Sequence, residues 1–311
     1  MYNNQPMKKY FLSVVSWLCF ALLLVSSSES VSQHHDQIAA FGYSTNGKTD
    51  YNSPNADITL NPNNSTEMPS LNLTGVPTLY NANGIAVNPI TNKIYVIDYS
   101  NDSLYIANGR TDSVTGNLKL SSEPWIDSPN SIAVDPNTNA VYITKELLGL
   151  VSVYDGATNM REAEYHVGSQ PPSDCIGPRC HVYTWSIAVD PIAGKIYTTQ
   201  GCGCNSNSIT VLTLNNGTEK REDIISGNVN PFGIAVNPST HMVYVSNEGI
   251  LHDGNTVSVI NGSSNKIVDT VLLGTTGNDR VGPQAIAVNP ETNMVYVATY
   301  WTHSLYAALL T

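Results

Sequence analysis

A segment of 15 residues occurs five times in this chain, and this repetition constrains the fold more than any other feature. The clearest copy runs from Gly233 to Asn247 and reads GIAVNPSTHMVYVSN. Each copy has a proline at the same place, and successive prolines lie 47, 55, 47 and 52 residues apart. Repeats with periods near this length form stacked supersecondary units, and β-propeller blades are the leading example. The five prolines are Pro89, Pro136, Pro191, Pro238 and Pro290.

Each repeat predicts four short antiparallel strands. The Ile-Ala-Val run contains small and β-branched residues, which is typical of a strand crowded on both faces. It ends at a turn signal, Asn-Pro or Asp-Pro, and a second strand with a recurring tyrosine follows. A third strand comes after a polar loop, and an Asn-Gly or Asp-Gly dipeptide is expected to close it tightly onto a fourth. The tyrosines are Tyr95, Tyr142, Tyr197, Tyr244 and Tyr296, and the dipeptides are Asn108-Gly109, Asp155-Gly156, Asn216-Gly217 and Asn261-Gly262.

The strand count at the two ends predicts how the ring closes. The fifth repeat has only three strands before Thr311, whereas Ser70–Gly75 (SLNLTG) is a strand candidate that precedes the first repeat. Pairing it with Ser304–Leu309 would complete the last blade and cover an exposed sheet edge. We therefore expect an all-β protein over residues 70–311, a β-propeller of five four-stranded antiparallel blades closed by its N- and C-terminal strands. The alternatives are a fragment of a larger ring that is truncated at Thr311, or a ring that another chain completes.

The repeats resemble the YVTN-type β-propeller repeats of archaeal and bacterial cell-surface proteins. The resemblance is carried by IAVNP, by VYVSN ending at Asn247, and by TVSVINGSSNKIVDTV from Thr256. It extends over about Leu71–Leu310, and the segment Tyr197–Gln200 (YTTQ) departs most from the pattern. The resemblance implies a surface-layer or extracellular binding protein, and it transfers no catalytic residue to this chain.

The first 28 residues have the layout of a secretory signal peptide. Two lysines precede an apolar run, Tyr10–Val25, and small residues follow as far as Ser28. This run has 16 residues, fewer than the roughly 20 that cross a bilayer comfortably. We predict cleavage after Ser28, with an uncleaved membrane anchor as the alternative. Residues 29–69 contain few apolar side chains and are expected to form a flexible polar stalk.

The charge balance argues against nucleic acid or an anionic membrane surface as a partner. Only 13% of the residues are charged, and 25 acidic residues against 14 basic ones give a net charge of -11. A weakly charged, polar surface and several N-glycosylation triplets agree with an extracellular or cell-surface location. The candidate glycosylation sites are Asn64, Asn72, Asn101, Asn216 and Asn261.

Four cysteines would remain after cleavage, in the motifs CIGPRC and GCGC. The two motifs fall in loops that emerge at the same end of a four-stranded blade, so the four sulfur atoms can meet. In an exported chain we expect disulfides, and pairing between the motifs is easier than closing the small Cys-x-Cys ring. The alternative is a zinc or copper(I) site of thiolates with His181; no other cofactor is expected. The cysteines are Cys175, Cys180, Cys202 and Cys204.

The end of the ring that carries the longest loops, called the mouth from here on, also holds several aromatic side chains. Aromatic residues among long loops are typical of a recognition surface for a glycan or a protein. The alternative is that each one anchors its loop on a neighbouring blade. His252 and His303 fall in corresponding loops and, with His181, would serve a metal-dependent or lyase-type enzyme. The aromatic candidates are Trp125, Tyr183, Trp185, Tyr300 and Trp301.

The recurring acidic position argues against catalysis. The residue before the turn proline alternates between Asn and Asp, which a turn cap accepts and a catalytic carboxylate would not. His166 and His241, on an outer strand and in a turn, are expected to be exposed and without a role. We thus predict a binding or display module for a protein or glycan, with the enzyme and a structural surface-array component as alternatives. The alternating residues are Asn88, Asp135, Asp190, Asn237 and Asn289.

Overall fold

The computed structural model describes nine segments of the chain. The signal and stalk segments and the expected closing strand Ser70–Gly75 lie outside them. No helix among the described residues is long and apolar enough to span a membrane. The described segments are residues 82–111, 113–121, 128–167, 183–201, 207–215, 218–225, 230–249, 254–274 and 280–309.

Nineteen strands form five antiparallel sheets in the described part of the chain. Neighbouring strands in a sheet are consecutive in sequence, so each sheet is a meander built by one repeat. The first sheet contains β1 (Ala82–Asn88), β2 (Lys93–Asp98), β3 (Ser103–Asn108) and β4 (Ser113–Lys119). The second contains β5 (Pro129–Asp135), β6 (Ala140–Lys145), β7 (Leu150–Asp155) and β8 (Arg161–His166). The third contains β9 (Tyr183–Asp190), β10 (Lys195–Gly201), β11 (Ser208–Asn215) and β12 (Thr218–Ile225). The fourth contains β13 (Pro231–Asn237), β14 (Met242–Asn247), β15 (Thr256–Asn261) and β16 (Lys266–Leu272), and the fifth contains β17 (Pro283–Asn289), β18 (Met294–Thr299) and β19 (Leu305–Leu309).

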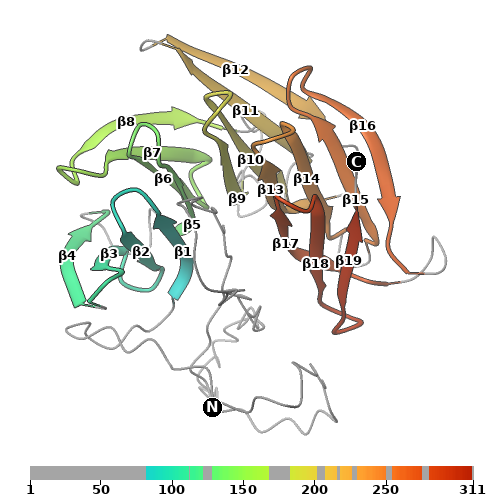
Figure 1. The fold of residues 1–311 in the computed structure, drawn as a ribbon, viewed down its shortest axis with the longest axis horizontal. Coiled ribbons are helices and arrows are strands. Elements are labelled where there is room, and N and C mark those ends of the chain that lie inside the picture. Colours follow the sequence, from blue (N-terminus) through green and yellow to red (C-terminus); the bar gives the residue numbers. More distant parts are fainter. Residues whose placement is uncertain are drawn as a thin grey trace, which may run out of the picture.

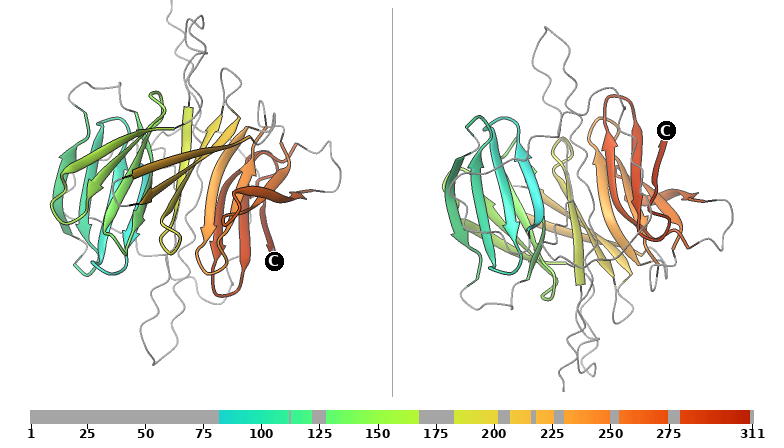
Figure 2. Two further views of the ribbon diagram at one scale, coloured as in Figure 1. Left: turned by 90° about the horizontal axis from the view of Figure 1, so that it is seen from above. Right: turned by 90° about the horizontal axis from the view of Figure 1, so that it is seen from below.

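The sheets are the blades of a five-blade β-propeller. They follow one another around a common centre in chain order, with the first strand of each blade innermost and, in the first four blades, the fourth strand outermost (Figure 1). The inner strands β1, β5, β9, β13 and β17 contact one another in that order. Views from above and below show the sheets standing side by side, with loops at both ends (Figure 2). The predicted fold class is therefore confirmed.

The hydrophobic core is divided among the boundaries between blades. Four apolar clusters are present, and each contains side chains from two successive blades. The recurring tyrosine of the first four blades belongs to these clusters, and it is at most 6% exposed in each case. Burial raises the pKa of Tyr95 and Tyr142 to about 12, so these phenols stay protonated at neutral pH. The tyrosines are packing residues, as the sequence predicts.

The turn after each inner strand has the same conformation in all five blades. Its last residue adopts a positive φ of 54° to 63° in every blade. Asparagine and glycine tolerate this conformation best, and four of the five blades use one of them. The side-chain oxygen of the residue before the proline accepts backbone N–H bonds from the turn, which confirms the capping role. The positive-φ residues are Asn92, Asn139, Gly194, His241 and Asn293.

The expected tight hairpin between the third and fourth strands is wrong for three blades. The connections there span residues 109–112, 156–160 and 262–265, whereas the fourth dipeptide, Asn216-Gly217, lies outside the described residues. The glycines in the three longer connections do not adopt a positive φ. Instead, a Cβ on Gly156 would lie 2.5 Å from the backbone oxygen of Asn139, to which the Gly156 N–H donates. Glycine is required there because the turn between the third and fourth strands touches the turn between the first and second strands.

Replacing Gly156 by alanine should lower the free energy of unfolding by about 1–3 kcal/mol, because backbone must move to admit the new methyl group. Urea denaturation would measure the loss. Gly116→Ala is the matched control, since its Cβ would meet only the Ile106 side chain, at 3.6 Å or more. Equal stability of the two variants would contradict the close-approach explanation.

Candidate recognition site

The mouth is built from the starts of the inner strands and the ends of the second strands. The backbone N–H of Glu146, which follows β6, donates to Ser128 O at 3.0 Å, and Glu248 N donates to Asn230 O at 3.1 Å. The corresponding bond in blade five joins Tyr300 N to Gly282 O. These bonds show that, in blades two, four and five, the start of the first strand and the end of the second strand lie at the same end of the blade.

Three aromatic rings form a continuous row across the mouth of blades three and four. Tyr183 and Trp185 lie on the same face of β9, and their ring centroids are 5.6 Å apart at an interplanar angle of 13°. Trp185 also stacks on Phe232 of β13, with centroids 5.1 Å apart and an angle of 28°. All three side chains are half-buried. Tyr183, Trp185 and Phe232 are called the aromatic row below.

Phe232 was missed by the sequence reasoning, although a signal for it exists. In every repeat the residue two places before the first Ile of the Ile-Ala-Val run lies at the mouth, and it is polar in three repeats and aromatic in two. Variation at one position of a regular repeat marks a place that packing does not fix. The five residues are Asn83, Asn130, Trp185, Phe232 and Gln284.

The indole of Trp185 lies against Gly201 of β10. A Cβ on Gly201 would be 3.0 Å from Trp185 Nε1 and 2.0 Å from Asn230 Oδ1. Glycine at this position therefore lets the indole and the amide come together over the backbone. Neither of these two buried atoms has a hydrogen-bond partner in the described part of the chain.

Two glutamates occupy equivalent positions on either side of the aromatic row. Glu146 lies next to Tyr183, because its backbone oxygen accepts the N–H of Thr184 at 3.1 Å. Glu248 lies beyond Trp185, since its carboxylate accepts from Asn230 Nδ2 at 3.3 Å and from Gln284 Nε2 at 2.5 Å. Glu146 is thus placed next to β9 by its backbone, and Glu248 is placed next to Asn230 and Gln284 by its carboxylate.

Burial raises the pKa of the Glu146 carboxyl from its ordinary value to about 7, and a hydrogen bond from the Tyr99 hydroxyl only partly opposes this. The folded protein therefore holds a proton on Glu146 at pH values where the unfolded chain has lost it. By linkage, this group makes stability fall as pH rises from about 4.5 to about 7.

Replacing Glu146 by glutamine should remove that fall. We subtract the free energy of unfolding of wild type from that of the variant. This difference should be about 2 kcal/mol larger at pH 8 than at pH 5. Denaturant titrations of both proteins at the two pH values would measure it. A difference that does not change with pH would show that the carboxyl is not buried as described.

The remaining candidates from the sequence are dispersed or lie outside the described residues. Tyr300 and Trp301 form a separate edge-to-face pair on blade five, with centroids 4.9 Å apart. His303 is exposed, and no group of three or more His, Cys, Asp or Glu that could hold a metal is found in the segments described. Asn101 Nδ2, a candidate glycan attachment atom, donates to Asp98 at 2.7 Å, and Asn261 is half-buried at the end of β15. Outside the described residues lie Trp125, Cys175, Cys180, His181, Cys202, Cys204, His252, Asn64, Asn72 and Asn216.

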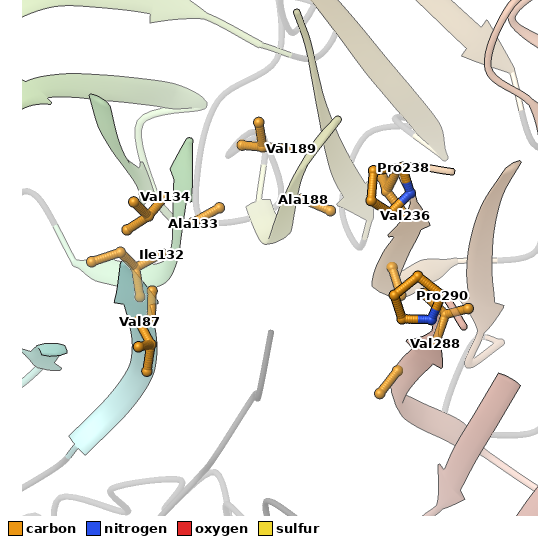
Figure 3. A pocket seen from close by; sticks show the side chains of 13 residues that line it. Val87, Ile132, Ala133, Val134, Ala188, Val189, Val236, Pro238, Val288 and Pro290 are labelled. Atoms are coloured by element: carbon orange, nitrogen blue, oxygen red, sulfur yellow. The ribbon is translucent and has the colours of Figure 1, made fainter. Parts of the chain in front are cut away.

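The central cavity lies near the turn prolines, at the end opposite to the mouth. It encloses about 70 Å³ and is lined only by Ala, Val, Ile and Pro, including Val134, Val189 and Pro238 (Figure 3). No lining side chain can donate or accept a hydrogen bond. Recognition chemistry is therefore assigned to the mouth.

His241 is not an inert surface residue, so that expectation was wrong. Its Nδ1 lies 2.6 Å from Oδ2 of Asp190, the fully buried capping residue of the preceding blade. A carboxylate can only accept, so Nδ1 carries the hydrogen. At two other blade boundaries an Asn pair makes the same link, from Asn88 to Asn139 at 2.8 Å and from Asn237 to Asn293 at 2.7 Å. At these three boundaries asparagine is linked to asparagine and aspartate to histidine.

Comparison with known proteins supports the fold and nothing finer. No protein-family model and no curated protein sequence matches the chain. Among solved structures, Raptor from Chaetomium thermophilum matches with a TM-score of 0.56 and 9% identity, over 72% of this chain and 19% of that one. The Cps50 (Swd1) β-propeller domain from Myceliophteria thermophila matches with a TM-score of 0.51 and 10% identity, over 70% of this chain and 62% of that one. Hydrazine synthase from Kuenenia stuttgartiensis matches with a TM-score of 0.45 and 14% identity, over 73% of this chain and 83% of that one. At these identities, and with TM-scores above 0.5 only for the first two, the likeness is one of fold, and this chain belongs to the class of β-propellers.

Proposed function

We propose that the protein is an exported cell-surface β-propeller of the YVTN type that binds or displays a protein or glycan partner without catalysis. The observation that carries the proposal is the aromatic row, which joins two blades at the mouth and leaves part of each ring open to solvent. Aromatic side chains set among polar groups are the usual centres of recognition surfaces. The apolar central cavity offers no competing site.

A combined glycan and peptide array, probed with wild-type protein and with Trp185→Ala, tests this function. We expect at least one class of ligand to be retained by wild type and lost by the variant. Ile192→Ala is the matched control, because Ile192 is 65% exposed in a turn at the opposite end of the blade. If Trp185→Ala binds its ligands as wild type does, the mouth is not the recognition site.

Export and disulfide formation belong to the same proposal and have separate tests. N-terminal sequencing of the mature protein should begin after Ser28, and an intact Met1 would contradict cleavage. Titration of the denatured, unreduced protein should find almost no free thiol, because an exported chain with four cysteines is expected to be oxidised. Free thiols together with bound zinc or copper would instead favour the metal alternative.

A further inference from the structure

We propose that Glu146 is a pH-sensitive latch at the mouth, which holds the start of β9 against blade two while its carboxyl is protonated and releases it when the carboxyl ionises. The inference goes beyond the proposed function, because the latch works with or without a ligand. It bears on that function through the aromatic row, since Tyr183 and Trp185 both lie on β9.

Glu146 joins three successive blades. It is the first residue of the four-residue turn between β6 and β7, in blade two. Its backbone N–H donates to Ser128 O of the same blade at 3.0 Å, and its backbone oxygen accepts the N–H of Thr184 in blade three at 3.1 Å. Its carboxyl accepts a hydrogen bond from the Tyr99 hydroxyl of blade one. One residue thus ties this turn to the blade before it and to the blade after it.

Thr184 connects the latch to the aromatic row. It stands between Tyr183 and Trp185 in β9, and it is fully buried. Because side chains alternate along a strand, the Thr184 side chain faces away from the two rings, while its N–H fixes the backbone that carries them. On its other side this part of β9 pairs with β10. Losing the bond to Glu146 therefore loosens one side of β9 beneath the stacked rings and leaves the sheet intact.

The Glu146 carboxyl is neutralised by a proton rather than by a basic side chain. Among the described residues, burial and the Tyr99 hydroxyl are the influences on this carboxyl, and burial is the larger. The adjacent Lys145 pairs its ammonium with a glutamate of β8 at 2.5 Å. Tyr183 on β9 and Asp102 in blade one act on the Tyr99 phenol instead. An ionised Glu146 can therefore be stabilised only by regaining contact with water.

This need for water gives the latch its pH range. Burial raises the pKa of the Glu146 carboxyl from an ordinary 4.5 to about 7 in the folded protein. The preference for the closed turn is complete below the lower value and is lost as pH rises through the higher one. Since each pKa unit is a factor of ten, ionisation shifts the balance toward a released, hydrated carboxyl by up to about 300-fold.

Blade four has a glutamate at the same position without these properties. Glu248 also follows the second strand of its blade, and its N–H donates to Asn230 O at 3.1 Å. Its carboxylate accepts from two side-chain amides, Asn230 Nδ2 at 3.3 Å and Gln284 Nε2 at 2.5 Å. Amide donors stabilise the charged form of a carboxylate, so an ionised Glu248 keeps its contacts. Blade four therefore serves as an internal control.

Hydrogen exchange of single backbone amides in the full chain, compared between wild type and Glu146→Gln, tests the latch. At pH 8 we expect the Thr184 N–H to exchange about tenfold faster in wild type, because glutamine stays neutral and keeps the turn closed. At pH 5 the two proteins should exchange nearly alike. The Glu248 N–H is the control, and its rate should be the same in both proteins at each pH. Equal Thr184 rates at pH 8 would overturn the inference.

A measurement on wild type alone keeps the test decisive if Glu146→Gln fails to fold. Protection of the Thr184 N–H, relative to that of Glu248, should fall about tenfold between pH 5 and pH 8. A constant ratio would overturn the latch.

The proposed function fails or stands by a different result. A ligand that depends on Trp185 should bind wild type more weakly at pH 8 than at pH 6, because an ordered row is preorganised for binding. It should bind Glu146→Gln equally at both pH values. If no ligand depends on Trp185 while Thr184 exchange behaves as expected, the proposed function fails and the latch stands. If such a ligand exists while Thr184 exchange is the same in both proteins, the latch alone fails.

Discussion

Deleting Ser70–Gly75 should lower the melting temperature by roughly 10 °C. The reason is the state of β19, the third strand of blade five. Its counterparts β3, β7 and β15 are almost completely buried, whereas residues alternate between exposed and half-buried along β19. Leu305 is 58% exposed and Leu309 is 60% exposed. Among the described strands β19 pairs only with β18, so its outer edge needs a fourth strand.

The size of the effect follows from the apolar surface at stake. Covering the two leucines stabilises the fold by about 2–4 kcal/mol, and each kcal/mol shifts the melting temperature of a domain of this size by about 2–4 °C. Differential scanning calorimetry would measure the shift. The control is a deletion of equal length within residues 29–69, which should leave the melting temperature unchanged. The same result for both deletions would contradict closure by Ser70–Gly75 and favour another occupant of the β19 edge.

Replacing His241 by alanine should lower the free energy of unfolding by about 2 kcal/mol. The substitution leaves Oδ2 of Asp190, which is 0% exposed on its side chain, without its partner on the next blade. Asp190→Ala should cost more, about 3 kcal/mol, because it also removes the two backbone bonds by which the carboxylate caps the turn. Chemical denaturation of the single variants would measure both losses.

The double variant Asp190→Asn/His241→Asn tests the physical basis of this link. It recreates the asparagine pair found between blades one and two and between blades four and five. Asparagine also tolerates the positive φ at position 241. We expect the double variant to lie within about 1 kcal/mol of wild type, and His166→Ala, on an exposed position, within about 0.5 kcal/mol. A double variant as unstable as Asp190→Ala would show that the pair is not an interchangeable bridge.

Most of the fold could be predicted from the sequence because it depends on patterns among residues close together in the chain. Strand alternation, the Asn-Pro or Asp-Pro turns and the five-fold repetition each depend on residues close together in the chain. The four strands predicted for each repeat are present in the first four sheets, and three of them are described in the fifth. The hairpin prediction was wrong at Gly156 and its equivalents. The glycine was taken as a sign of a two-residue turn, whereas it is needed because its backbone lies against the turn that follows the first strand.

The candidate site could be predicted only in part. Tyr183 and Trp185 were identified as aromatic loop residues, but the row they form with Phe232 depends on the approach of β9 to β13. The raised pKa of Glu146 was not visible either, because its carboxyl is desolvated only in the folded ring, where it also accepts a hydrogen bond from Tyr99 of the preceding blade. A carboxylate in a polar loop has no local signal for burial.

The sequence by itself determined the blade, its strands, its turns and the number of repeats, since these arise from side-chain periodicity and backbone preference within each repeat. The tertiary structure alone decided what happens between blades. It placed Asp190 against His241, brought Phe232 of one blade onto Trp185 of the blade before it, and desolvated the Glu146 carboxyl beside Tyr99. The physical reason is that these contacts join residues that come together only when neighbouring repeats pack around the centre of the ring.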